Sequence, residues 1–406
     1  MKNPFEFGRE LGSDELVDRQ EEVGAVMRTI REGGKLFLIG PRRYGKTSIL
    51  KTAGDRLVRE ESAILLRYNA EGFTDTQQLV ARIVADAAGA LRAPLERVGE
   101  AVKKYFQRLQ PELSFNATQT SWSAKIGIAQ GRAAGEGELR LVVDALDGLE
   151  RLASEQPAER PVGLIIDEFQ KLVEGSRESE AQIRAAVQQH ARVGYVFAGS
   201  KTRLLTDMVT DAARPFYRLG SSLFIAEIPR EDFRQFLTSR FAEGGFGIEG
   251  RDPRKADEGE NETRKPPVDL ILDDAEEVPY NVQMLAHVCW ELLTEAGGGS
   301  TLTGEVVRGA LERLVRQYDA FYTQVWNQQT TAQQKALIAC IETGGRGMLS
   351  IKITHATRKG PGTIKRALES LVARDILREE ESRGQIRYRF EDPFFAKWIG
   401  MFTAKL

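Results

Sequence analysis

The sequence contains few of the residues that build disulfide-rich or zinc-dependent proteins. Its 406 residues include only two cysteines, Cys289 and Cys340, which lie far apart and lack the C-x-x-C spacing of a metal site. We expect each of them to be a small core residue. The three histidines, His190, His287 and His355, form no H-x-x-x-H or H-E-x-x-H pattern, so a histidine metal site is not expected.

Long apolar runs and a strong net charge are also missing. No run approaches the ~20 apolar residues of a membrane-spanning helix, and the N-terminus has no apolar signal segment. The net charge of −2 gives no overall signature of a nucleic-acid-binding or membrane-binding protein. With 41% apolar and 29% charged residues, the composition indicates an ordinary globular protein of two or three domains. The simplest compartment is the cytoplasm, with no membrane partner.

The most informative segment is a complete phosphate-binding motif, G-x-x-x-x-G-K-T, at residues 40–47. A strand-like apolar run, residues 35–39, precedes it, and a helical pattern follows. Backbone amides and the helix N-terminus of such a loop provide a positive field for phosphates. We expect Lys46 to reach the β- and γ-phosphates and the Thr47 hydroxyl to hold Mg²⁺. The motif predicts nucleotide contacts from Gly40, Pro41, Arg42, Arg43, Tyr44, Gly45, Lys46, Thr47 and Ser48.

A second motif places two adjacent acids at the end of an apolar run, residues 162–168. We expect Asp167 to organise Mg²⁺, directly or through water, and Glu168 to orient and deprotonate the attacking water. A buried strand that ends in two carboxylates would otherwise leave both charges without partners. The alternative is an acidic helix cap. Together with the phosphate loop, the acidic pair predicts hydrolysis of the nucleotide.

Between residues 35 and 228, short apolar segments alternate with helical ones. This pattern predicts an α/β fold, a P-loop NTPase core whose parallel sheet is covered by helices on both faces. The fourth strand is expected to lie between the first and the third. Residues 111–137 interrupt the pattern and predict an inserted β-hairpin with a flexible link, either a surface ribbon or a contact for a partner or a second copy. The expected strands are residues 35–40, 62–69, 162–168, 194–200 and 223–228.

Three further residues are weaker candidates for catalysis. Ser200 ends the fourth expected strand and could bond the γ-phosphate or the attacking water, or could be an ordinary helix cap. Lys201 and Arg203, which follow it, could add positive charge. Arg214 and Arg218 precede the fifth strand, and either could be an arginine finger from its own or a neighbouring subunit. The alternative for these two arginines is a surface or interface ion pair.

The rest of the chain has a helical character. Residues 230–328 are expected to form a helical lid, with helices at 231–241, 278–293 and 302–325 and a charged, disordered loop at 244–267. From about Thr331, the order is helix, short helix, helix and two strands, which is typical of a winged helix-turn-helix. The predicted domains are therefore an ATPase core at 1–229, the lid at 230–328 and the winged helix at 329–406.

In this order, the motifs resemble those of the AAA+ and STAND ATPases. The closest likeness is the archaeal-type ATPase group, which joins such a core to a C-terminal winged helix. In that group an Arg-Glu-Glu-like stretch packs beside the adenine, which makes Asp18 and Arg19 candidate base-pocket residues. Residues 278–285 resemble the proline-containing lid motif of the group, so Pro279 is a candidate contact to the base or ribose. Residues 392–395, with a following tryptophan, match its C-terminal signature.

The resemblance implies an ATP-operated switch that changes conformation or oligomeric state and signals to a protein partner, and such a switch can be a slow ATPase. No Asn-Lys-x-Asp motif occurs, which favours ATP over GTP. The alternative is a DNA-binding ATPase of the origin-recognition or transposition-regulator type. A structural nucleotide-binding module is a third option, against which Glu168 argues.

The charge of the C-terminal segment bears on the choice between these functions. From Thr331 onward, 14 lysines and arginines outnumber eight acidic residues. A basic surface of this kind can bind duplex DNA through its phosphates. However, Glu369 and residues 379–381 interrupt the basic face, and winged helices of this group also dock proteins, so both functions stay open. The basic residues that would line the second helix, the recognition helix and the wing are Lys352, Arg358, Lys359, Lys365, Arg366 and Arg387.

Overall fold

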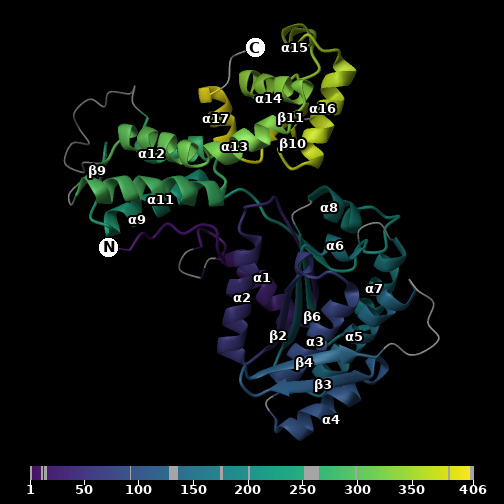
Figure 1. The fold of residues 1–406 in the computed structure, drawn as a ribbon. Coiled ribbons are helices and arrows are strands. Elements are labelled where there is room, and N and C mark those ends of the chain that lie inside the picture. Colours follow the sequence, from purple (N-terminus) through teal and green to yellow (C-terminus); the bar gives the residue numbers. More distant parts are fainter. Residues whose placement is uncertain are drawn as a thin grey trace. The chain divides into compact units, whose positions relative to one another are not determined.

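The chain divides into two compact units (Figure 1). The sheet unit is Arg9–Glu227, and the helical unit comprises Met1–Gly8 and Ile228–Leu406. None of the helices in the part of the chain described below is long and apolar enough to cross a membrane. The computed structural model describes residues 2–10, 12, 16–91, 93–127, 136–173, 177–199, 202–250, 265–297, 300–382 and 385–402.

The sheet unit is built on a five-stranded sheet in the order β2-β5-β6-β1-β7. All four strand pairs are parallel. Every residue of β5 and β6 is buried, as expected for strands that are covered on both faces. The predicted α/β fold is confirmed, and β6 lies between β1 and β5 as predicted. The strands are β1 (Lys35–Ile39), β2 (Ile64–Asn69), β5 (Val162–Asp167), β6 (Val193–Gly199) and β7 (Ser221–Phe224).

The edge strand β7 ends earlier than residue 228, the predicted end. Its last contact with the sheet is the bond from the Ile225 amide to the Ile39 carbonyl, 2.7 Å long, after which the chain leaves the sheet. The other strands agree with the prediction to within two residues at each end. The carboxyl ends of β1, β5 and β6 therefore lie at one edge of the sheet, and the loops that follow them meet there.

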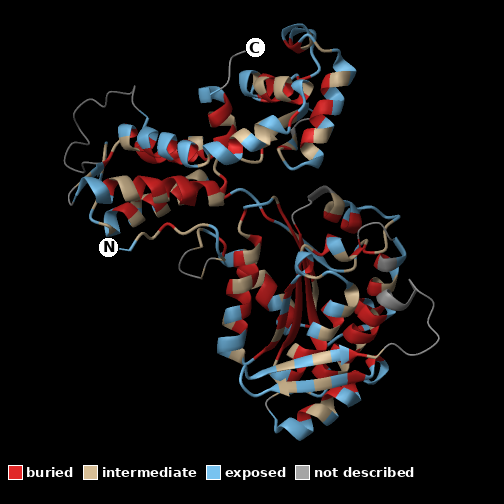
Figure 2. Ribbon diagram, in the orientation of Figure 1, coloured by how far each residue is buried: buried red, intermediate tan, exposed pale blue. Residues whose placement is uncertain are grey.

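Helices cover both faces of the sheet, and their buried sides are turned toward it (Figure 2). A core of aromatic and aliphatic side chains fills the space between the sheet and the helices α3, α5 and α7. Phe169, directly after the acidic pair, lies in this core with its ring 4.4 Å from that of Phe197. The helices of this unit are α1 (Gln20–Arg31), α2 (Lys46–Glu61), α3 (Thr76–Ala90), α4 (Leu95–Tyr105), α5 (Glu136–Ser154), α6 (Gln170–Val173), α7 (Arg177–Gln189) and α8 (Thr202–Thr210), with short 3₁₀ turns at Ala70–Gly72 and Gln107–Leu109.

The predicted hairpin is present as β3 (Pro111–Asn116) and β4 (Ser121–Ile126), which pair in antiparallel fashion. It packs against the main core through Leu113 and Trp122, so it is anchored to the unit on one face. The other face is exposed, which gives both strands alternating burial. Most of the predicted flexible link, residues 128–135, lies outside the described residues.

Within the described residues, the first part of the helical unit contains five helices and a small two-stranded sheet. A single helix was predicted at 302–325, but the structure has two helices there, which meet at Tyr318. The helix α10 was not predicted; it is short and begins with a proline at its first turn. The predicted loop at 244–267 contains β8, and residues 251–264 of it lie outside the described residues. The elements are α9 (Arg230–Glu243), β8 (Gly247–Ile248), α10 (Pro267–Asp274), α11 (Pro279–Ala296), β9 (Thr301–Leu302), α12 (Gly304–Gln317) and α13 (Asp319–Asn327).

The N-terminal segment belongs to the helical unit, whereas the prediction placed it in the ATPase core. The reason is the side chain of Phe5, which is fully buried. Its ring lies 4.8 Å from that of Phe241, 5.9 Å from that of Trp290 and 6.1 Å from that of Phe236. These aromatic contacts fix the segment against α9 and α11. The other predicted domain boundaries stay predictions.

The last part of the helical unit has the predicted order of a winged helix. Thr330 and Gln333 form a capping box that begins its first helix. The hairpin that forms the wing contacts the turn after this helix, because the Tyr388 amide donates to the Gly345 carbonyl. A last helix, α17, packs Trp398 against α13, and its indole N–H donates to Asp319. The elements are α14 (Thr331–Thr343), α15 (Ile351–Thr357), α16 (Pro361–Ala373), β10 (Leu377–Ser382), β11 (Gln385–Phe390) and α17 (Pro393–Phe402).

Candidate nucleotide site

The phosphate loop connects the end of β1 to the first turn of α2. Gly45 is the N-cap of α2 and has φ 85°, a left-handed conformation that favours glycine. The helix begins at Lys46, so the free amides of its first turn lie at the loop. The N-terminus of a helix carries a partial positive charge. The local geometry is therefore that of an anion-binding loop.

The Lys46 side chain is held within the loop. It is only 6% exposed. Its Nζ donates hydrogen bonds to the carbonyl oxygens of Gly40, at 2.8 Å, and Pro41, at 2.7 Å. These carbonyls compensate for the loss of water around a buried ammonium group. The structure thus places the predicted phosphate-binding cation at the loop that would carry the phosphates.

The phosphate loop and the acidic pair meet directly. The Thr47 hydroxyl donates a hydrogen bond of 2.8 Å to Oδ2 of Asp167, a residue 120 positions away in the sequence. Asp167 is buried, and its Oδ1 accepts a hydrogen bond of 3.0 Å from the Glu168 amide. Burial raises the pKa of the Asp167 carboxyl, while the hydrogen bond from Thr47 opposes that rise. The structure therefore brings together two residues that were predicted from separate motifs.

These residues fit a magnesium ion. The Thr47 hydroxyl and the Asp167 carboxylate offer only oxygen atoms, which are the ligands that Mg²⁺ prefers. Burial disfavours the negative charge of Asp167, and a nearby cation would stabilise it. No cluster of three or more His, Cys, Asp or Glu side chains that could hold a metal occurs among the described residues. One carboxylate and one hydroxyl suit an ion that keeps several waters and binds phosphate oxygens.

Glu168 adopts an unusual backbone conformation and is tied to a neighbour. Its φ of 52° lies in the left-handed region, which side chains other than glycine seldom adopt. Its carboxylate accepts a hydrogen bond of 2.5 Å from Nε2 of Gln170. Sequence reasoning missed Gln170, whose only signal was its place two residues beyond the acidic pair. Strained residues that neighbouring contacts hold in place cluster at functional sites.

The weaker catalytic candidates lie in different surroundings. Arg214 forms an ion pair with Glu180, a carboxylate that is only 1% exposed, and its Nε lies 3.2 Å from Oε2. This contact favours the ion-pair alternative for Arg214. Arg218 is exposed and lies over the ring of Tyr217, 5.1 Å from its centroid. Ser200 and Lys201 lie outside the described residues.

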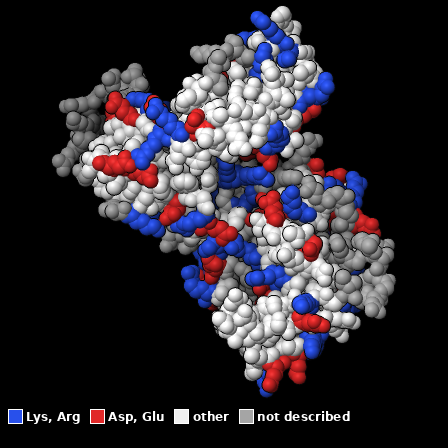
Figure 3. Space-filling view, in the orientation of Figure 1, with Lys and Arg blue, Asp and Glu red and all other residues white. Residues whose placement is uncertain are grey.

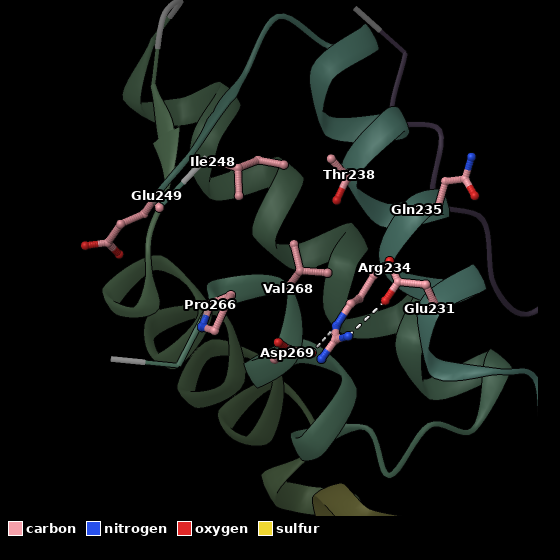
Figure 4. Close-up of a pocket in the computed structure, with 10 residues that line it drawn as sticks. Glu231, Arg234, Gln235, Thr238, Ile248, Glu249, Pro266, Val268 and Asp269 are labelled. Atoms are coloured by element: carbon pink, nitrogen blue, oxygen red, sulfur yellow. Dashed lines mark hydrogen bonds and ion pairs between the residues drawn. The ribbon is translucent and has the colours of Figure 1, made fainter. Parts of the chain in front are cut away.

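A pocket of about 530 Å³ lies in the helical unit between α9, β8 and α10 (Figure 4). Its lining includes three carboxylates, Glu231, Glu249 and Asp269, and one guanidinium, that of Arg234. Arg234 donates to both Asp269, at 2.7 Å, and Glu231, at 2.9 Å. The lining is therefore acidic overall and unsuited to the phosphates of a nucleotide.

Comparison with known proteins supports the fold. No family model and no curated protein sequence matches the chain. Among solved structures, the Walker-type ATPase PABY2304 of Pyrococcus abyssi is 15% identical, with TM-score 0.58, over 98% of this chain and 99% of that one. The ORC2 protein of Aeropyrum pernix, in ADPNP–ADP complexes, is 15% identical, with TM-score 0.54, over 98% and 97%. The chain has the AAA+ P-loop ATPase fold.

Within this AAA+ fold, the candidate base-pocket residues Asp18 and Arg19 immediately precede α1. Arg19 is 4% exposed, and its guanidinium donates to Glu22, at 2.9 Å, and to the Ala226 carbonyl, at 2.8 Å. Its Nε makes no hydrogen bond within the described part of the chain. Pro279 is the first residue of α11 in the helical unit, and its contact with a nucleotide stays a prediction.

Proposed function

We propose that this chain binds and hydrolyses ATP and uses the nucleotide state as a conformational switch. The observation that carries the proposal is the hydrogen bond between Thr47 and Asp167, which joins the phosphate loop to the acidic pair. The AAA+ fold supports it, because this fold places both motifs at the carboxyl edge of one sheet. A chance glycine-rich turn would have no reason to contact a buried acid.

In the proposed reaction, the loop amides and the N-terminus of α2 bind the phosphates. The Lys46 ammonium then exchanges its two carbonyl partners for oxygens of the β- and γ-phosphates. Thr47 and Asp167 would hold Mg²⁺, which would supply positive charge to neutralise the phosphates. Glu168 orients the attacking water and accepts its proton, while the water oxygen bonds to the γ-phosphorus and the bond from the γ-phosphorus to the leaving oxygen of ADP breaks.

The link from the site to the switch is the connection between the two units. The chain passes between them at Gly8–Arg9 and at Glu227–Ile228. Arg19, a candidate contact to the base, donates to the carbonyl of Ala226, which directly precedes Glu227. A nucleotide that displaces Arg19 would break this hydrogen bond within the sheet unit and free the segment that leads to the second passage. A few residues at the end of an element can act as a hinge in this way. The output is a rearrangement of the units, passed to a protein partner or a second copy of the chain.

Lys46→Ala tests the proposal in a nucleotide titration, with Lys51→Ala on the same helix as the control. We expect Lys46→Ala to lose at least about a hundredfold in ATP affinity, because a charge-assisted phosphate contact is removed, and Lys51→Ala to bind normally. Small-angle X-ray scattering should show an ATP-dependent change of shape in the wild type and none in Lys46→Ala. Normal binding by Lys46→Ala would overturn the nucleotide site. Binding by the wild type without a change of shape would overturn the switch.

A second candidate function is contact with duplex DNA through the winged helix. The observation that favours it is the exposure of Lys352, Lys365 and Arg366 on α15 and α16. Two observations weigh against it. Lys365 lies 3.8 Å from the carboxylate of Glu369, and Ile351, beside Lys352, is 79% exposed. On the face drawn in Figure 3, basic side chains form separate groups, so we place protein docking first.

A further inference from the structure

We infer that Gln170 is a positioning residue, whose side-chain amide holds the carboxylate of Glu168 in one direction for the hydrolytic step. The inference rests on the proposed function, in which Glu168 acts on the attacking water. The contact is the hydrogen bond of 2.5 Å between Nε2 of Gln170 and Oε2 of Glu168. Gln170 itself is only 1% exposed, so its side chain cannot exchange this contact freely for water.

The direction of the Gln170 amide follows from its neighbour. An ionised carboxylate only accepts hydrogen bonds, so the NH₂ group must face Glu168. The Oε1 atom then points away, is buried, and accepts no hydrogen bond within the described residues. Leaving a buried acceptor unpaired disfavours the folded state. Packing stability alone therefore does not explain a glutamine at this position.

The far end of the amide is fixed by the end of β6. A Cβ atom at Gly199 would lie 2.2 Å from Oε1 of Gln170, 2.4 Å from Cδ1 of Leu205 and 3.2 Å from Cδ of Gln170, so the glycine leaves the space that the amide occupies. The backbone before it is fixed too, because the Phe169 amide donates to the Ala198 carbonyl at 2.9 Å. The amide is thus held on one side by β6 and holds Glu168 on the other.

The hydrogen bond from Gln170 to Glu168 should affect the rate of hydrolysis more than it affects the affinity for the nucleotide. A free glutamate side chain samples several rotamers, and only some of them would reach a water near the phosphates. A neutral amide restricts the carboxylate without adding charge beside Asp167. A general base must lie within hydrogen-bond reach of its proton, and small misplacements lower the rate strongly. Gln170 therefore contributes to kcat and not to ATP affinity.

Gln170→Met tests this inference, because methionine has a similar length but no donor. The matched control is Gln189→Met, at an exposed position of α7. We expect Gln170→Met to lower kcat by at least about tenfold while the Kd for ATP stays within twofold. The control should change neither value. An unchanged kcat, or a fall that arises only from weaker ATP binding, would overturn the inference.

A double-mutant cycle shows whether Gln170 acts through Glu168. In single-turnover assays, Gln170→Met should lower the rate of the wild type but not the residual rate of Glu168→Gln. Equal losses in both backgrounds would mean a merely structural role and would overturn the inference. If Gln170→Met does not fold, the isosteric Gln170→Glu replaces it, and kcat should fall at least as much, because two adjacent carboxylates share a proton and Glu168 is no longer a free base. A wild-type kcat in folded Gln170→Glu would also overturn the inference.

The same measurements separate this inference from the proposed function. If Glu168→Gln hydrolyses ATP at the wild-type rate, the proposed role of Glu168 fails and the role of Gln170 fails with it. If Glu168→Gln loses turnover while Gln170→Met keeps it, only the inference about Gln170 fails.

Discussion

The nucleotide site and the winged helix use charged residues in opposite ways. In the sheet unit, Lys46 and Asp167 are buried, and each has defined partners, although the motifs that supply them lie far apart in the sequence. On the winged helix, Lys365 and Arg366 are exposed, and the bond from the Arg366 Nε goes only to a carbonyl of its own helix. The first arrangement is a set of buried, partnered charges at the candidate site, whereas the second is a set of solvent-exposed charges.

This difference sets the size of the effects to be expected from mutation. Buried charges are desolvated, so removing the partner of one leaves an unpaired charge and a large unfavourable free energy that hydration cannot offset. Exposed charges are screened by solvent and salt, and their individual contributions are small. Substitutions in the candidate nucleotide site should therefore lower ATP binding or turnover strongly. Substitutions on the winged helix should act weakly and only on the binding of a partner.

The largest expected effect is that of Asp167→Asn on ATP turnover. The amide keeps the shape of the side chain but removes the charge that would organise Mg²⁺, so kcat should fall on the order of a thousandfold. Phosphate release by purified protein measures it, with the exposed Asp55→Asn as the control. Turnover within tenfold of the wild type would mean that the bond between Thr47 and Asp167 does not mark the metal site.

A smaller effect, on stability, is expected from Arg214→Ala. Loss of this guanidinium leaves the buried carboxylate of Glu180 unpaired, which should lower the free energy of unfolding by about 3 kcal/mol. Urea denaturation measures the change, and the double variant with Glu180→Gln should recover part of it. The kcat of the folded protein should not change. A loss of turnover without a loss of stability would instead identify Arg214 as an arginine finger.

The smallest effect is expected on the winged helix. Changing both Lys365 and Arg366 to Glu should leave ATP turnover within twofold of the wild type. If this surface binds duplex DNA, the double variant should lose about tenfold or more in affinity at low salt, with a shallower salt dependence. Fluorescence anisotropy with labelled duplex, with and without ATP, measures both quantities. Absence of binding by the wild type at low salt would remove the DNA function and leave protein docking.

Sequence reasoning predicted the fold, which is confirmed, and led to the candidate nucleotide site, because both depend on local patterns. Short segments of the sequence are enough to predict the phosphate loop, the buried strands and the order of elements in the winged helix. The role inferred for Gln170 could not be predicted, because it depends on the space that Gly199 leaves at the end of another strand. An ion pair was one of the two alternatives for Arg214, but its partner Glu180 could not be identified for the same reason, nor could the place of Phe5 in the helical unit. Contacts between distant segments have no local signature.

The most direct test of the central claim is the fate of ATP on Glu168→Gln. The variant keeps the phosphate loop, Thr47 and Asp167, so it should bind ATP with wild-type affinity. After incubation with ATP and Mg²⁺, the isolated variant should still hold ATP and release phosphate at least about a hundredfold more slowly than the wild type. The wild type should hold ADP. Phosphate release by Glu168→Gln at the wild-type rate would contradict the account.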